Sequence, residues 1–153
     1  MPVTIRVVVP PELRRALDGN MQRVVQRASP GIIRELHATV AKYPPATAAN
    51  QPNHRWYERG YGPRWTRKDG SIGGSKTSEM LNRSWGTQRK SWGMILGSRA
   101  SYSPVVHSYE EQAKFHGTRG WVTDKQAADK VIQSGKVDRI VKAAVARVLK
   151  GMG

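Results

Sequence analysis

The chain has no cysteine, and it has few acidic side chains, a single phenylalanine and no long apolar run. Without cysteine it can form neither a disulfide framework nor a thiolate metal site. A membrane-spanning helix needs about 20 mostly apolar residues in a row, and no such run is present. The N-terminal residues, with Arg6 inside a short apolar stretch, do not have the layout of a signal peptide. We therefore expect a soluble protein, made in the cytoplasm, that does not bind a membrane.

The scarcity of acidic side chains leaves a large positive charge. The 26 lysine and arginine residues against 11 aspartate and glutamate residues give a formal net charge of +15, spread along the whole chain. Such an excess attracts polyanions such as nucleic acids, or an acidic protein partner, without any reading of base sequence. A basic surface that only keeps the protein soluble is the simpler alternative.

Core-forming side chains are also few. The hydrophobic fraction of 38%, with 15 glycines and nine prolines, is low for a compact domain. The length predicts a single domain over residues 1–153. Part of this domain is expected not to be buried in its own core.

The N-terminal third has the pattern of a strand followed by helix. Residues 3–9 alternate between apolar and polar, as a half-buried strand does. Residues 12–43 carry apolar side chains at the three-and-four spacing of an amphipathic helix. Gly19 and the Ser-Pro-Gly stretch at 29–31 predict two helices or one sharply kinked helix.

The second half is predicted to contain a strand pair and a helical tail. Residues 85–98 read as two strands around a turn near 89–90, and residues 100–106 as a further short strand or turn. From residue 123 onward, apolar residues recur on one helical face with lysines and arginines opposite. The expected fold is α+β, in which a small antiparallel sheet is covered by a long N-terminal helix and a C-terminal amphipathic helix.

Residues 44–78, here called the arm, lack any clear period and are dense in Pro, Gly, Asn and Ser. A loop of this length is uncommon in a compact domain and usually has a function of its own. The arm interleaves cationic and aromatic side chains: Arg55, Arg59, Arg64, Arg67 and Lys68 with Trp56, Tyr57, Tyr61 and Trp65. Three interpretations stay open: contact with nucleic acid, a protein–protein interface, and aromatic rings that fold back on the sheet.

Residues 101–121, SYSPVVHSYEEQAKFHGTRGW, hold two of the four histidines and an adjacent glutamate pair. Two imidazoles on one helix face bind a metal when they are four residues apart, whereas His107 and His116 are nine apart. Glu110 and Glu111 are neighbours and diverge on either a helix or a strand, so they do not form a converging acid–base pair. We expect no catalytic residues, no metal site and no cofactor.

Short motifs in the chain are arranged as in one known family. Tyr-Pro-Pro at 43–45 follows the first long helix, LNRSW at 81–85 follows the arm, and YSPVVH at 102–107 follows the predicted strand pair. Gly-Trp at 120–121 then precedes a basic amphipathic helix. This order resembles the tail-component, or tail-completion, proteins of long-tailed bacteriophages and prophages, which are found among head–tail joining genes. The likeness covers residues 30–150.

The chain departs from that family's pattern at two places. Residues 77–80 read Thr-Ser-Glu-Met, where the family typically has a Thr-Gly turn before the leucine motif. Ser103 stands after the tyrosine of the second motif, where alanine is typical.

The resemblance implies a structural virion protein of the neck or tail, a tail-completion or collar component that is not an enzyme. Identical subunits are expected to form a ring, sixfold or a multiple of it, between the head connector or adaptor and the tail terminator or tube. Non-specific contact with packaged DNA would suit the unpatterned charge. The expected apolar anchors between subunits are Trp56, Tyr57, Tyr61, Trp65, Tyr102, Val105, Val106, Tyr109, Phe115 and Trp121. A polar rim is expected from His107, Glu110, Glu111, Gln112, Lys114, His116 and Arg119, and Arg55, Arg59, Arg64, Arg67 and Lys68 are expected to face DNA or an acidic partner.

Overall fold

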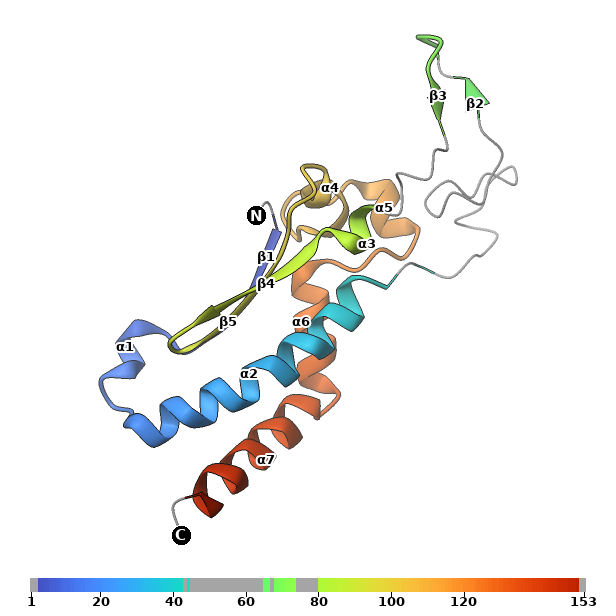
Figure 1. The fold of residues 1–153 in the computed structure, drawn as a ribbon. Coiled ribbons are helices and arrows are strands. Elements are labelled where there is room, and N and C mark those ends of the chain that lie inside the picture. Colours follow the sequence, from blue (N-terminus) through green and yellow to red (C-terminus); the bar gives the residue numbers. More distant parts are fainter. Residues whose placement is uncertain (1–2, 43, 45–64, 67, 74–79, 152–153) are drawn as a thin grey trace.

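The computed structural model describes residues 3–42, 44, 65–66, 68–73 and 80–151, and Figure 1 shows the arrangement of their elements. In chain order the elements are β1 (Val3–Val8), α1 (Pro11–Arg14), α2 (Gly19–Val40), β2 (Trp65–Thr66), β3 (Ile72–Gly73), α3 (Met80–Arg83), β4 (Trp85–Lys90), β5 (Gly93–Ser98), α4 (Ser103–His107), α5 (Lys114–Thr118), α6 (Asp124–Gln133) and α7 (Lys136–Lys150). The fold is α+β, with a small antiparallel sheet, a long N-terminal helix and a C-terminal helix, as the sequence predicts.

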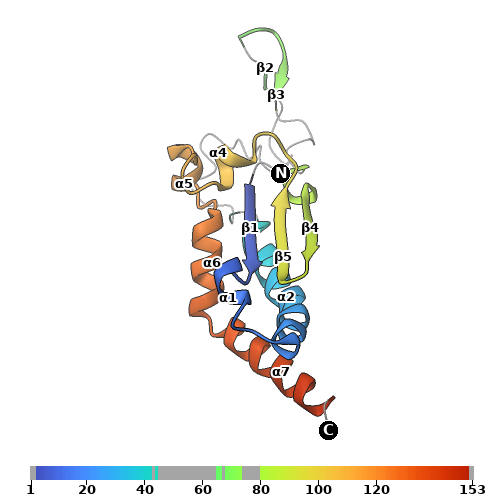
Figure 2. The ribbon, with the colours of Figure 1, turned by 90° about the vertical axis from the view of Figure 1, so that its left-hand side faces the viewer.

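The main sheet has the strand order β1-β5-β4, with both pairs antiparallel (Figure 2). In the β1–β5 pair, Val3 lies opposite Ser98 and Val8 lies opposite Gly93. The central strand β5 is buried along its whole length. Gly93 has φ +144°, and a Cβ built there would lie 1.9 Å from the carbonyl oxygen of Val7. Only glycine fits where the two strands come together.

Helices α2, α6 and α7 pack with this sheet to form the main core. Asp18 caps α2, since its side chain accepts a hydrogen bond of 2.9 Å from the backbone N–H of Met21. The buried residues of the core are Ile5, Val24, Ala28, Ile32, Ile33, Leu36, Val40, Met94, Leu96, Ala127, Val131, Ala144 and Val148. Their spacing on α2 and α7 is the amphipathic spacing seen in the sequence.

The predicted break at Gly19 is confirmed, because α1 ends at Arg14 and α2 begins at Gly19. Two helices are found, as one of the two predicted arrangements has it, but the break does not fall at 29–31, because α2 continues through Pro30 to Val40. A proline inside a helix costs about 3 kcal/mol, but each fully buried aliphatic side chain contributes about 1.5–3 kcal/mol. Six buried apolar side chains of α2 therefore outweigh this one defect.

Of the predicted short strand or turn at 100–106, a turn forms at 101–102, but the strand is wrong because α4 follows there. Val105 and Val106 are β-branched and favour a strand when taken alone. Pro104, however, lies in the first turn of α4, where its missing N–H would have no helical partner in any case.

The helical tail begins where the sequence predicts. Thr123 caps α6 in a reciprocal capping box, in which its side chain accepts from the N–H of Gln126 and the Gln126 side chain accepts from the N–H of Thr123. Gly135, with φ +74°, then separates α6 from α7. The C-terminal cover of the sheet is thus two helices rather than one.

Most of the arm lies outside the described residues. Its described part includes Pro44 and the antiparallel pair β2–β3, in which Trp65 lies opposite Gly73. Between these strands, the Asp69 carboxylate accepts hydrogen bonds from the N–H and the hydroxyl of Ser71. These two short strands were not predicted. In the described ranges no helix is long and apolar enough to cross a membrane.

Candidate functional site

Three motifs that carry the phage resemblance come together in space. Leu81 of LNRSW, Val106 of YSPVVH and Trp121 of Gly-Trp form a second core of buried residues, against which Ala100 packs. Figures 1 and 2 show α3, α4 and α5 at the same end of the three-stranded sheet. The shared property of these motifs is therefore structural, since together they build this end of the fold.

His107 lies at the centre of this end and is fully buried, with an exposed fraction of 0%. Its Nδ1 is 2.7 Å from the carbonyl oxygen of Val122. Because a carbonyl can only accept, the imidazole donates its Nδ1–H. The rings of Trp85 and Trp121 stand edge-on to the imidazole, each with centroids 5.5 Å away. We call Leu81, Trp85, Val106, His107 and Trp121 the His107 cluster.

The charge state of His107 follows from its burial. Burial lowers the pKa of His107 below the usual value of 6.5, and this outweighs the opposite effects of the Val122 carbonyl and the Asp124 carboxylate. The imidazole is therefore neutral at physiological pH and packs within the buried His107 cluster. The prediction that His107 belongs to the polar, charged border of an interface is wrong, because its side chain is fully buried.

Side chains outside the cluster fix the loop around it. The amide of Gln112 donates to the carbonyl oxygens of Val106 at 2.8 Å and Trp121 at 3.0 Å. The N–H of Ala113 donates to the carbonyl oxygen of Val105 at 2.9 Å. These hydrogen bonds hold residues 108–113 against α4 and against the segment that leads into α6.

The serine of the LNRSW motif has a defined local partner. The hydroxyl of Ser84 lies 2.7 Å from the carbonyl oxygen of Leu81 and 2.8 Å from the hydroxyl of Ser98. Ser98 is the last residue of β5 and is fully buried. Ser84 thus attaches α3 to the central strand of the sheet.

The same segment of the chain also carries four exposed apolar side chains, which we call the exposed rim: Tyr102, Val105, Tyr109 and Phe115. Their exposed fractions range from 42% to 60%. Among the described residues there are eight exposed large hydrophobic side chains, and four of them lie in the 14 residues 102–115. The rings also contact cations, because Lys125 lies 4.4 Å from the centroid of Tyr109. Exposed aromatic rings on a fixed backbone are typical of protein interfaces.

The structure divides the six anchors predicted in residues 101–121. Tyr102, Val105, Tyr109 and Phe115 are exposed, but Val106 and Trp121 are only 4% and 5% exposed because they belong to the chain's own core. Within residues 101–121, the interface prediction is wrong for Val106 and Trp121 and stays a prediction for the four exposed residues.

The predicted arm residues are mostly not placed. Trp56, Tyr57, Tyr61, Arg55, Arg59, Arg64 and Arg67 lie outside the described residues. Trp65 begins β2, and Lys68 is exposed beside it.

His116 lies between Phe115 and Trp121, with ring centroids 4.1 Å and 6.4 Å away. Burial lowers the pKa of His116 to about 4, and the nearby Arg119 and His107 add to this effect. Within the ranges that the structure describes, no group of three or more His, Asp or Glu side chains is placed to hold a metal ion.

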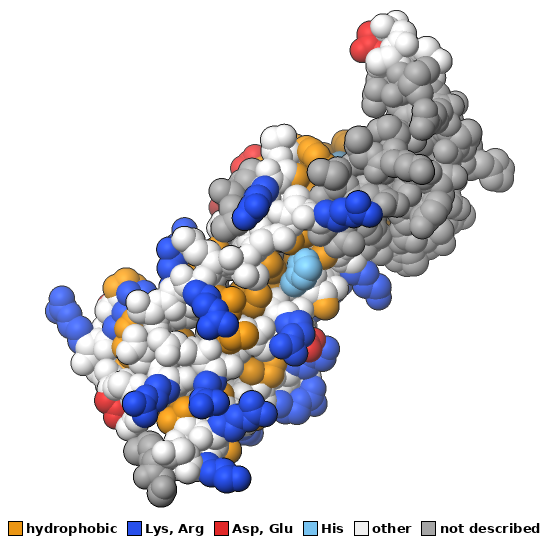
Figure 3. Space-filling view, in the orientation of Figure 1, with side chains coloured by type: hydrophobic (Ala, Val, Ile, Leu, Met, Phe, Trp, Pro, Cys, Tyr) orange, Lys and Arg blue, Asp and Glu red, His pale blue; other side chains and the backbone are white. Residues whose placement is uncertain are grey.

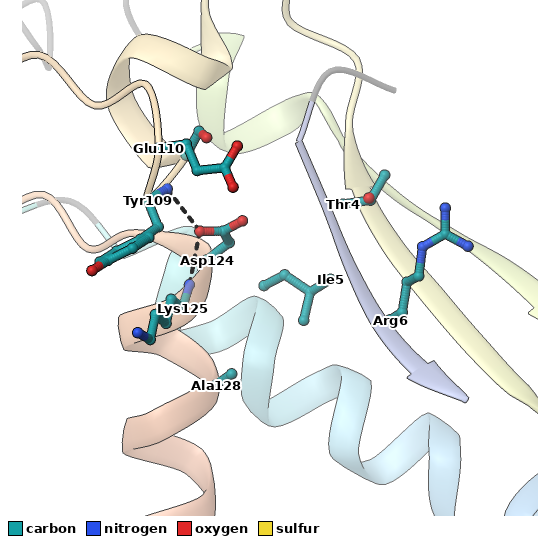
Figure 4. A pocket seen from close by; sticks show the side chains of 9 residues that line it. Thr4, Ile5, Arg6, Tyr109, Glu110, Asp124, Lys125 and Ala128 are labelled. Atoms are coloured by element: carbon teal, nitrogen blue, oxygen red, sulfur yellow. Dashed lines mark hydrogen bonds between the residues drawn. The ribbon is translucent and has the colours of Figure 1, made fainter. Parts of the chain in front are cut away.

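A shallow pocket opens beside the free edge of β1 (Figure 4). It is lined by Thr4, Ile5, Arg6, Ser108, Tyr109, Glu110, Asp124, Lys125 and Ala128. The Asp124 carboxylate accepts hydrogen bonds from the backbone N–H groups of Tyr109 at 2.9 Å and Lys125 at 2.8 Å. Asp124 therefore ties the start of α6 to the loop that carries Tyr109.

Sequence analysis missed one further surface, the row of arginines along α2. The signal was present, since Arg23, Arg27 and Arg34 follow the helical period. The arginines of the arm are more conspicuous in the sequence because they alternate with aromatic residues.

Comparison of the chain with protein-family models, with curated proteins and with solved structures finds no match in any of the three.

Proposed function

We propose that this chain is a structural protein of the neck or tail of a long-tailed bacteriophage, where identical subunits assemble into a ring that joins the head connector to the tail. The exposed rim carries the proposal. Four large apolar side chains, on α4, α5 and the residues beside α4, are costly to leave in water and favour burial against another protein chain. The convergence of the three motifs in the His107 cluster supports the resemblance, because these motifs then specify one structural unit.

Self-association of the purified protein tests the proposal. We expect wild-type protein to sediment as monomer and one oligomer of fixed size, whose share rises with concentration, and a Val105→Ser/Phe115→Ser variant to shift toward monomer. The matched control is Ile132→Ser/Leu149→Ser, which removes two other exposed large apolar side chains, on α6 and α7. Both variants should retain the wild-type circular dichroism spectrum.

Two results would contradict assembly through the rim. One is a wild-type protein that stays monomeric at every concentration, and the other is an equal loss of association in the rim variant and in the control. The genomic setting provides an independent test, because a neck protein should be encoded beside portal, adaptor or tail-tube genes.

A sequence-independent nucleic-acid-binding protein is the second candidate function, favoured by the net charge of +15. It differs from the first in that binding would not require a ring. Negligible affinity for DNA at physiological salt would exclude it.

A further inference from the structure

Helix α2 carries a straight row of arginines on its outer surface. Arg23, Arg27 and Arg34 are all exposed. At about 100° per residue, their spacing places them within about 40° of one another around the helix axis. Over 11 residues the row is about 16 Å long.

Helix α7 brings a second cationic row beside the first. Arg139, Arg147 and Lys150 are exposed and lie within about 80° of one another around the axis. The two helices run side by side in opposite directions (Figure 1), so that a Cβ at Gly31 of α2 would lie 3.1 Å from the Ile140 side chain of α7.

The two rows meet at a groove between the helices. Arg23 and Arg27 of α2 line it together with Gln26, and Arg147 of α7 lines it together with Val148 and Gly151. In Figure 3, lysine and arginine side chains gather over the part of the molecule where Figure 1 has α2 and α7. We call Arg23, Arg27, Arg34, Arg139, Arg147 and Lys150 the arginine face.

The acidic side chains of α2 and α7 pair with cations other than those of the arginine face. The acidic residues of the two helices are Glu35 and Asp138. Glu35 pairs with Lys136 at 2.6 Å, and Asp138 pairs with Lys142 at 2.8 Å. Both carboxylates thus pair with cations outside the arginine face.

The chemistry of this face fits a phosphate backbone better than a protein. Five of its six cations are arginines, whose planar guanidinium groups bind phosphate oxygens in pairs. A protein interface of this size would have an apolar or aromatic centre. The exposed large apolar side chains of the two helices, Met21 and Leu149, lie away from the rows by helical spacing.

We propose that the arginine face binds the phosphate backbone of double-stranded nucleic acid without reading its sequence. A row of about 16 Å spans about five phosphate steps of one strand at 3.4 Å each. The packed α2–α7 pair fixes the backbone positions from which the six cations extend, so that their spacing is set before binding. The proposal concerns a different surface from the exposed rim and does not depend on ring assembly.

The test measures binding of fluorescently labelled duplex DNA of two unrelated sequences, by anisotropy over a series of salt concentrations. The wild type should bind both sequences equally, with an affinity that falls steeply as salt rises. Arg27→Glu/Arg147→Glu should reduce the slope of log affinity against log salt by about two, and should weaken binding of both sequences alike. Arg99→Glu/Lys114→Glu is the matched control, because it changes two exposed cations outside the arginine face and alters net charge equally.

Each other outcome overturns part of the proposal. If both double variants lost binding equally, the effect would be one of net charge alone. If the slope of log affinity against log salt were unchanged in Arg27→Glu/Arg147→Glu, binding would be assigned to another surface, such as the arm. Polyglutamate and unlabelled DNA are compared as competitors at equal concentration of negative charge. If polyglutamate displaced the labelled DNA as effectively as unlabelled DNA does, the partner would be an acidic protein. No DNA binding by the wild type would remove both this proposal and the second candidate function, whereas sedimentation reports on ring assembly separately.

Discussion

His107 is a titratable side chain in a structural role. One nitrogen donates to the Val122 carbonyl, and the ring fills the space between Trp85 and Trp121. A neutral imidazole can stand in a core because a single hydrogen bond to the backbone fixes its tautomer. At the residue scale, this end of the fold depends on side chains that can be both apolar and hydrogen-bonded.

We predict that acid destabilises the protein through His116. The pKa of this side chain is about 4 in the folded chain and 6.5 as its ordinary value. Between these values the unfolded chain binds more protons, so stability is complete above about 6.5 and falls as the pH drops toward about 4. Urea denaturation of wild type and His116→Gln at neutral and mildly acidic pH checks this. A wild type and a variant that lose stability equally would contradict it.

We predict that Trp121→Ala destabilises the fold by about 3–5 kcal/mol, the usual cost of truncating a buried tryptophan. Trp121 is 5% exposed, belongs to the second core and contacts His107. Denaturant midpoints measure the change, and Phe115→Ala, at a residue that is 54% exposed, is the control with a much smaller expected effect. Unchanged melting of Trp121→Ala would show that this end of the fold does not depend on the tryptophan.

At the scale of elements, the boundaries of the C-terminal helices are set by a few local signals. Thr123 and Gln126 satisfy one another's backbone N–H groups at the start of α6, and Gly135 supplies the left-handed turn before α7. The Gly135 conformation is one that other residues rarely adopt. These signals act within a few residues, which is why the beginning of α6 was predictable.

We predict that Thr123→Ala lowers the stability by about 1 kcal/mol, because one N–H at the start of α6 loses its acceptor. Thermal melting measures the loss. Thr118→Ala, which removes an exposed threonine of α5, is expected to change stability less. Equal effects of the two substitutions would show that the capping box contributes nothing beyond a generic threonine.

Local signals fail where distant parts of the chain decide the outcome. Pro30 and Gly31 predict a break, but α2 continues because its buried face packs on β5 and α7. Val105 and Val106 predict a strand, but α4 forms where Leu81 and Trp121 provide a core. Local spacing cannot show such partners, because they lie about 15 to 100 positions away in the chain.

The same reasoning applies to the candidate site. Composition pointed to residues 101–121, because aromatic and charged side chains concentrate there, and an interface in this segment stays a prediction. It could not separate Val106 and Trp121, which face inward, from Val105 and Phe115, which face outward, since that division depends on the turn into α4. The arginine row of α2 was readable from its period, but its meeting with α7 depends on the tertiary fold.

At the scale of the whole molecule, repulsion among cations opposes the compact state. The net charge is +15 on a chain of 153 residues. The arginine face concentrates part of this charge on two packed helices. Bound polyanions or dissolved salt should therefore stabilise the fold.

We predict that the melting temperature rises as salt is added from low ionic strength, because the Debye length falls to about 10 Å at 0.1 M and screens this repulsion. The Arg27→Glu/Arg147→Glu variant, whose net charge is lower by four, should show a weaker rise. Differential scanning fluorimetry in sodium chloride measures both. A melting temperature that is independent of salt in the wild type would contradict the prediction.

The pairing of β1 with β5 also affects how the protein is made. Val3 lies opposite Ser98, so the first strand leaves the ribosome 95 residues before its partner does. Translation proceeds at about 5–20 residues per second, so β1 is complete about 5–20 s before the strand with which it pairs. Until β5 is made, apolar side chains of β1 and α2 lack their partner strand, so we expect slower translation between the two strands to lower the yield of soluble protein.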